Sequence, residues 1–130
     1  FVVCCEEHGY TESHQVAVDV RDHEGGRVQA QRLEDAGVVC NMNMLPGDTN
    51  PMRPSGLRLG TQELVRIGLG PGDMEDVATF YARVVLKGEE PAKVASSVAA
   101  FREDFQKVHY CFGPERGAYE FWDLVGEERG

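Results

Sequence analysis

Two apolar stripes at helical spacing, one after the other, constrain the fold more than any other feature of the sequence. Met74, Val77, Tyr81 and Val84 recur every three or four residues before Gly88, which puts them on one face of a helix that Asp73 is placed to cap. After Pro91, a second stripe follows at steps of four and three: Val94, Val98, Phe101, Phe105 and Val108. Each stripe needs an apolar partner, so we expect these helices to pack on a small sheet.

The first half of the chain predicts the strands of that sheet. Residues 1–5 and 15–20 are apolar and β-branched, which predicts a hairpin, and residues 38–41 and 57–60 predict two further strands. A short helix is expected from Val28 to Ala36, ended by Gly37. We therefore predict an α/β (α+β) domain, with a mostly antiparallel sheet of three to four strands. We expect one face to be covered by the helices that follow Thr61, Asp73 and Pro91.

Length and composition favour one domain and exclude some partners. The domain is predicted over residues 1–112, with a C-terminal tail over residues 113–130, and a chain that opens on Phe1 without a methionine is expected to be a fragment. Its 22 acidic and 13 basic residues give a charge of -9, which disfavours nucleic acid and membrane surfaces as partners. No apolar run approaches the roughly 20 residues of a bilayer span, and we expect a cytoplasmic protein with reduced cysteines.

Most chemical groups of the sequence favour ordinary structural roles. The acidic and histidine residues between Glu6 and His14 lack a recognised ligand spacing, so we expect a solvated turn and no metal site. The three lysines, Lys87, Lys93 and Lys107, lie among charged neighbours and are expected to be solvated. We therefore assign no catalytic residue to this chain.

The segment from Asn41 to Thr61 is the candidate site. Residues 41–54 are rich in Asn, Pro, Gly and Asp and predict a long loop, which often carries function. Arg58 follows on a strand between Gly56 and Gly60, where other groups can approach closely, and its planar fork matches a carboxylate. On these grounds alone a surface or salt-bridged arginine is the more frequent alternative.

Three motifs in order make the chain resemble the serine hydroxymethyltransferase (glycine hydroxymethyltransferase) family, over residues 11–68 and more loosely to 112. They are Thr11-Glu12-Ser13-His14 before a strand, Asn41-Met42-Asn43-Met44-Leu45-Pro46-Gly47-Asp48, and Ser55-Gly56-Leu57-Arg58-Leu59-Gly60-Thr61. The resemblance implies the C-terminal small domain of a fold-type I enzyme that uses pyridoxal 5'-phosphate and interconverts serine and glycine, with tetrahydrofolate as co-substrate.

The resemblance also implies roles for individual residues. Arg58 matches the arginine that binds the substrate carboxylate, Asn43 an asparagine near the pterin, and Asn50-Pro51-Met52 the loop that lines the folate site. His14 and Ser55 are assigned structural support. The lysine and the other cofactor groups lie upstream in the family, in a large domain that this chain lacks. The isolated chain is therefore expected to be inactive, and the full-length enzyme to be a homo-oligomer.

Two alternatives remain open at this stage. The segment Asn50-Pro51-Met52 differs from the family's usual Ser-Pro-Phe and is similar to that of folate-independent threonine aldolases and transaldolases, for which the amino-acid substrate would be threonine. The other alternative is a free-standing, non-catalytic binding or assembly module.

Overall fold

The structure is a computed structural model that describes residues 2–109 of the 130-residue chain. The predicted domain boundary at residue 112, the tail over residues 113–130 and Cys111 lie outside the described residues. Cys4, Cys5 and Cys40 are free thiols. None of the helices within residues 2–109 is long and apolar enough to cross a membrane.

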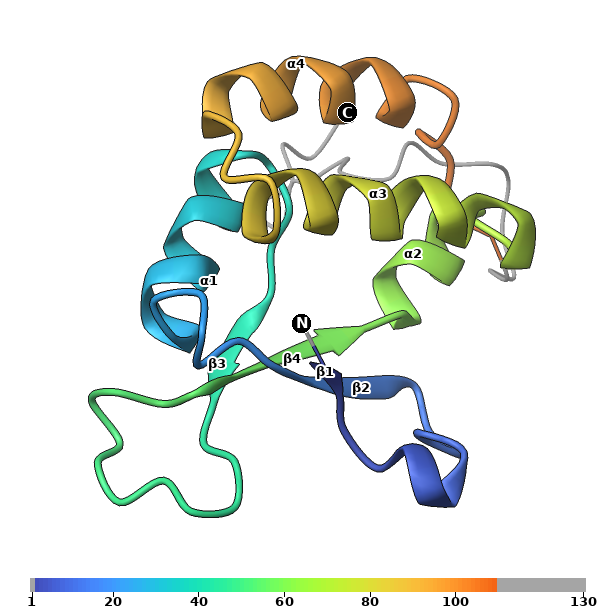
Figure 1. The fold of residues 1–130 in the computed structure, drawn as a ribbon. Helices are drawn as coiled ribbons and strands as arrows, with labels where there is room; N and C mark the ends of the chain where they lie inside the picture. Colours follow the sequence, from blue (N-terminus) through green and yellow to red (C-terminus); the bar gives the residue numbers. More distant parts are fainter. Residues whose placement is uncertain (1, 110–130) are drawn as a thin grey trace, which may run out of the picture.

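Four antiparallel strands form a single sheet in the order β1-β2-β4-β3 (Figure 1). The strands are β1 (Val2–Val3), β2 (Gln15–Asp19), β3 (Asn41–Asn43) and β4 (Gly56–Gly60). The central strand β4 pairs with β2 on one side and with β3 on the other. The predicted α+β class with a small antiparallel sheet is confirmed.

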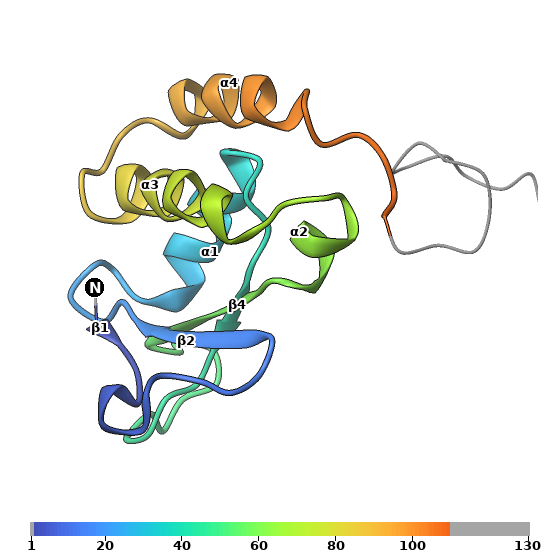
Figure 2. The ribbon, with the colours of Figure 1, turned by 90° about the vertical axis from the view of Figure 1, so that its right-hand side faces the viewer.

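The helices lie together on one side of the sheet (Figures 1 and 2). They are α1 (Gly26–Asp35), α2 (Gln62–Arg66), α3 (Met74–Val85) and α4 (Pro91–Arg102), with short 3-10 helices η1 (Glu6–His8) and η2 (Pro71–Asp73). The expectation that the helices after Thr61, Asp73 and Pro91 cover the sheet is partly wrong, because α1 lies directly on β3 and β4 while α4 packs on α1 and α3. Gly26 permits this close approach, since a Cβ there would lie 2.1 Å from the Gly56 carbonyl oxygen.

Several predicted element boundaries are shifted. The third strand was expected over residues 38–41 but runs from Asn41 to Asn43, because Val38 N–H instead donates to the Leu33 carbonyl (2.8 Å) at the end of α1. Helix α4 ends at Arg102, and Phe105 and Val108 continue the apolar stripe beyond it by packing around buried Ile67 and Leu69.

The expected helix caps at Thr61 and Asp73 also differ. Neither side chain caps the helix that follows it. The Thr61 hydroxyl donates to the His14 carbonyl (3.3 Å), and the Asp73 carboxylate accepts from Gly70 N–H (2.7 Å) in the turn before α3. Thr61 therefore contacts a residue distant in sequence, and Asp73 contacts the turn before α3, in place of capping.

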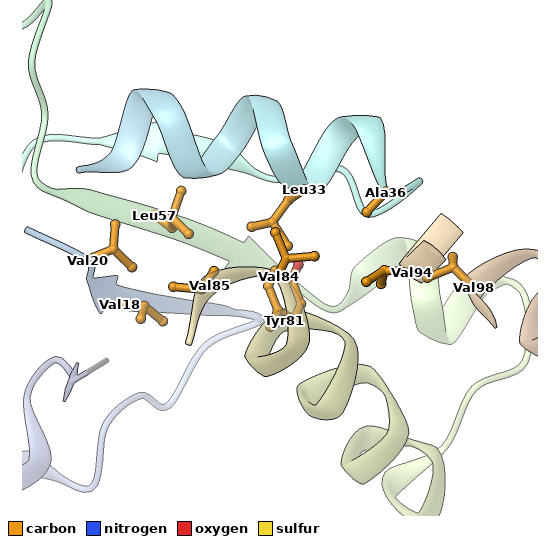
Figure 3. Packing of buried hydrophobic residues seen from close by; sticks show 10 residues of the cluster. All are labelled: Val18, Val20, Leu33, Ala36, Leu57, Tyr81, Val84, Val85, Val94 and Val98. Carbon is orange, nitrogen blue, oxygen red and sulfur yellow. The ribbon is translucent and has the colours of Figure 1, made fainter. Parts of the chain in front are cut away.

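The main core lies between the sheet, α1 and α3 (Figure 3). Val18 of β2 and Leu57 of β4 face each other in register and are almost completely buried. Leu33 of α1 and Val84 of α3 have no exposed surface. Because side chains alternate across a strand, this register sends every second strand residue to the opposite face.

The opposite face of the sheet, called the open face here, has no described helix over it (Figures 1 and 2). The loop between β3 and β4 meets this face where β4 begins, and the turn before β2 lies where β4 ends. The open face carries the residues that alternate with the core positions, namely Gln15, Ala17 and Asp19 of β2, Asn41 and Asn43 of β3, and Gly56, Arg58 and Gly60 of β4.

Candidate functional site

Arg58 lies at the centre of the open face. It is the middle residue of the central strand, and it pairs with Ala17 of β2 on one side and with Asn41 of β3 on the other. Its side chain is exposed. The next positions on the same face of β4 are Gly56 and Gly60, so Arg58 is the one side chain that this strand presents on the open face.

The guanidinium of Arg58 has no hydrogen bond or ion pair with any residue in the range 2–109. The four strands contain one acidic residue, Asp19, which lies one position diagonally from Arg58 on the open face. Its carboxylate instead accepts from Arg21, at 2.7 Å from Nε and 2.9 Å from the backbone nitrogen. Because Asp19 is engaged by Arg21, the fork of Arg58 is left available for an external carboxylate or other planar anion.

The loop that the sequence assigned to a cofactor or substrate borders the open face at the start of β4. Asn43, at the end of β3, donates its side-chain amide to the Met44 carbonyl (2.8 Å). The Asn50 side chain accepts from Met52 N–H (2.9 Å), so residues 50–52 form a compact turn. Asn50, Pro51 and Met52 are all exposed.

Asp48 organises this loop, and the sequence reasoning assigned it no role. Its Oδ2 accepts from Leu45 N–H (2.9 Å), Ser55 N–H (2.8 Å) and the Ser55 hydroxyl (2.9 Å). These bonds hold the pKa of the Asp48 carboxyl below its usual range, with the backbone donors contributing most and Arg21 adding a favourable charge. An aspartate beside Pro-Gly is a turn signal, but its partner seven residues later is not readable from sequence.

Ser55 and His14 connect the two ends of β4 to their surroundings. Ser55 is 8% exposed, and its carbonyl accepts from Val20 N–H (2.9 Å). At the other end, the His14 carbonyl accepts from the backbone N–H (3.0 Å) and the hydroxyl of Thr61. The His14 ring is exposed, so the contacts of this residue come from its backbone.

The remaining candidates are dispersed and solvated. Glu6, Glu7, His8, Glu12 and His14 are exposed in the turn between β1 and β2, and within residues 2–109 no group of three or more metal-binding side chains comes together. The lysines Lys87, Lys93 and Lys107 are exposed, and none belongs to the sheet or to the loop between β3 and β4. The described residues thus place the guanidinium of Arg58 on the open face, with no lysine beside it for a Schiff-base cofactor.

Comparison with known proteins places this geometry in a family. A family model described as serine hydroxymethyltransferase matches residues 7–81, which is more than half of the chain and includes the whole sheet except β1. The chain belongs to the serine hydroxymethyltransferase family. The matched range includes Asn43, the loop with Asp48, and Arg58, so the open face lies largely within the part of this serine hydroxymethyltransferase-family chain that the family model matches.

Two archaeal relatives extend the similarity along nearly all of the chain. Serine hydroxymethyltransferase of Methanopyrus kandleri is 50% identical over 121 residues, covering 92% of this chain and 28% of the relative. The protein of the same name from Methanocella arvoryzae is 49% identical, covering 93% of this chain and 29% of the relative. The chain therefore spans less than a third of the length of these serine hydroxymethyltransferases.

A solved structure supports the same placement. L-threonine transaldolase from Pseudomonas fluorescens superposes with a TM-score of 0.68 and 33% sequence identity, covering 79% of this chain and 23% of that one. The fold of this serine hydroxymethyltransferase-family chain is thus shared with a further enzyme that, by its name, acts on threonine.

Proposed function

We propose that this chain is the small, substrate-binding domain of a serine/glycine hydroxymethyltransferase that uses pyridoxal phosphate, and that Arg58 binds the α-carboxylate of the amino acid. The observation that carries the proposal is the unpaired guanidinium at the centre of the open face, in a chain of this family. Amino-acid substrates all carry a carboxylate, and a bidentate arginine pair both binds it and fixes its direction.

The residues of this chain contribute binding and orientation. Arg58 holds the carboxylate, and Asn41 is its cross-strand neighbour on β3, on the same face of the sheet. When bound, pyridoxal phosphate supplies the electron sink for breaking bonds at the α-carbon. Because no lysine lies beside Arg58, we propose that a separate large domain holds the cofactor. We also propose that the full-length enzyme is a homo-oligomer.

The loop between β3 and β4 is proposed to receive the second substrate. Asn43 and the exposed turn Asn50-Pro51-Met52 stand at the end of the open face where β4 begins. A ligand held there would approach the amino acid on Arg58 from one side. We assign tetrahydrofolate to this position, because the family match includes the loop.

The proposal is tested with the full-length protein that contains this chain, loaded with pyridoxal phosphate. Conversion of serine to glycine is expected to require tetrahydrofolate, and cleavage of threonine in its absence is expected to be slower than serine turnover by roughly tenfold or more, about 1.4 kcal/mol. Both reactions are measured by product formation under the same conditions. The isolated 130-residue chain is the control and should be inactive, because it lacks the lysine site.

A second candidate function has its own support. Met52 stands where the family usually has an aromatic residue, and the similar solved structure is named a threonine transaldolase. Rapid folate-independent turnover of threonine, with little serine turnover on adding tetrahydrofolate, would establish this candidate and refute hydroxymethyl transfer to folate.

A further inference from the structure

We propose that Asp48 is a positioning residue that sets the loop between β3 and β4 for the second substrate, while Arg58 binds the amino acid independently of it. This inference rests on the proposed function and adds a residue to it. The loop runs from Met44 to Ser55 and joins the two strands that carry Asn43 and Arg58. Its conformation therefore decides where a ligand at Asn43 lies relative to the carboxylate on Arg58.

Asp48 ties the beginning of this loop to its end. One carboxylate oxygen, Oδ2, accepts from Leu45 N–H at 2.9 Å and from both the N–H and the hydroxyl of Ser55 at 2.8 and 2.9 Å. A carboxylate oxygen suits three donors because it bears negative charge and offers acceptors only. An asparagine side chain could place its carbonyl oxygen where Oδ2 lies, but that oxygen is neutral, so the three bonds would be weaker.

Both residues held by Asp48 help to anchor the loop to the rest of the fold. Leu45 is 8% exposed and lies over Gly56, where a Cβ would come within 2.6 Å of the leucine side chain. Ser55 continues into the sheet through the bond from Val20 N–H to its carbonyl. The turn Asn50-Pro51-Met52 beyond them is exposed, so its position depends on these two anchors.

The hydrogen bonds from Leu45 and Ser55 to Asp48 are separate from the hydrophobic core that stabilises the domain. The main core is built from β2, β4, α1, α3 and α4, and no residue between Met44 and Ser55 belongs to it. The positive charge of Arg21 also lowers the pKa of the Asp48 carboxyl, and Arg21 is itself paired with Asp19. Breaking the hydrogen bonds to Asp48 should therefore displace the loop, while the core and the strand that carries Arg58 stay intact.

The experiment compares Asp48→Asn and Asp48→Ala with Asp22→Asn in the full-length holoenzyme. Asp22 is an exposed acid next to Arg21 in sequence and lies outside the loop, so it controls for the loss of one charge. Asp48→Ala removes the shared acceptor and is expected to raise the KM for tetrahydrofolate by roughly 10- to 100-fold, and Asp48→Asn, which keeps a neutral acceptor, is expected to raise it less. The KM for serine should stay within about twofold, because Arg58 makes no contact with Asp48.

Amide hydrogen exchange of Ser55 gives a readout that does not depend on which substrates the enzyme uses. It should become faster in both Asp48 variants and stay unchanged in Asp22→Asn. Equal rises in the KM values of serine and tetrahydrofolate, or unchanged exchange at Ser55, would overturn the positioning role. A wild-type enzyme that ignores tetrahydrofolate would refute the proposed function instead, and the exchange experiment would still decide whether Asp48 holds the loop.

Discussion

Replacing Arg58 by alanine in the full-length holoenzyme is expected to lower kcat/KM for serine by roughly a hundred- to thousandfold, about 3 to 4 kcal/mol. The substrate carboxylate would lose both hydrogen bonds of the guanidinium fork and would enter the site without a countercharge. Arg58→Lys keeps the charge but loses the fork, so it should recover only part of the activity. Steady-state kinetics with serine as the varied substrate gives the comparison.

Lys93→Ala is the control for this experiment. Lys93 is also an exposed cation, but it lies on α4, which packs on α1 and α3. This variant also removes one positive charge, and its kcat/KM for serine is expected to stay within about twofold of the wild-type value. Because Arg58 has no described partner, its replacement should leave thermal unfolding nearly unchanged. An active Arg58→Ala enzyme would remove the carboxylate-binding role from this residue.

Gly26→Ala is expected to lower the free energy of unfolding of the chain by on the order of 3 kcal/mol, the upper range for overpacking. A Cβ at Gly26 would lie 2.1 Å from the Gly56 carbonyl oxygen, 3.0 Å from its carbon and 3.1 Å from the Pro54 oxygen. All three atoms belong to the backbone, so no side-chain rotation can relieve the contact. The start of α1 would have to move away from β4, which also weakens the bond from Gly26 N–H to the Pro54 carbonyl (2.8 Å).

Gly72→Ala serves as the control for the stability experiment. A Cβ at Gly72 would have no neighbour within 4 Å. Its effect on the free energy of unfolding is expected to be within about 0.5 kcal/mol. Urea unfolding of both variants, followed by circular dichroism, compares the midpoints. Equal midpoints for Gly26→Ala and wild type would show that α1 can shift freely on the sheet.

Local patterns predicted the fold class and the longest helix, because those depend on neighbours in sequence. The apolar stripe from Met74 to Val84 is complete within one segment, and α3 matches it from Met74 to Val85. One error arose where a distant contact decides. The role of α1 on the sheet depends on the close approach of Gly26 to Gly56. The shift of β3 has a local cause, the bond from Val38 N–H to the Leu33 carbonyl that extends the end of α1.

The same distinction applies to the site. Residue type and motif order identified Arg58, Asn43 and the loop, and their roles as ligand contacts stay predictions. The register of β3 with β4 puts Asn41 and Asn43 on the same face of the sheet as Arg58. The sequence could not indicate that Asp19 is engaged by Arg21 and so leaves Arg58 unpaired. Nor could it indicate that one oxygen of Asp48 serves both ends of the loop.

The pairing of β4 on both sides has a consequence for the entropy of binding. The backbone under Arg58 is already fixed by two neighbouring strands before any ligand arrives, so ordering it adds no cost on association. What remains to be frozen is the rotamer freedom of one exposed side chain, about 2 kcal/mol for an arginine. A carboxylate ligand thus binds an arginine side chain that can change its rotamer, while the backbone that carries it is held in β4 by the strands on both sides.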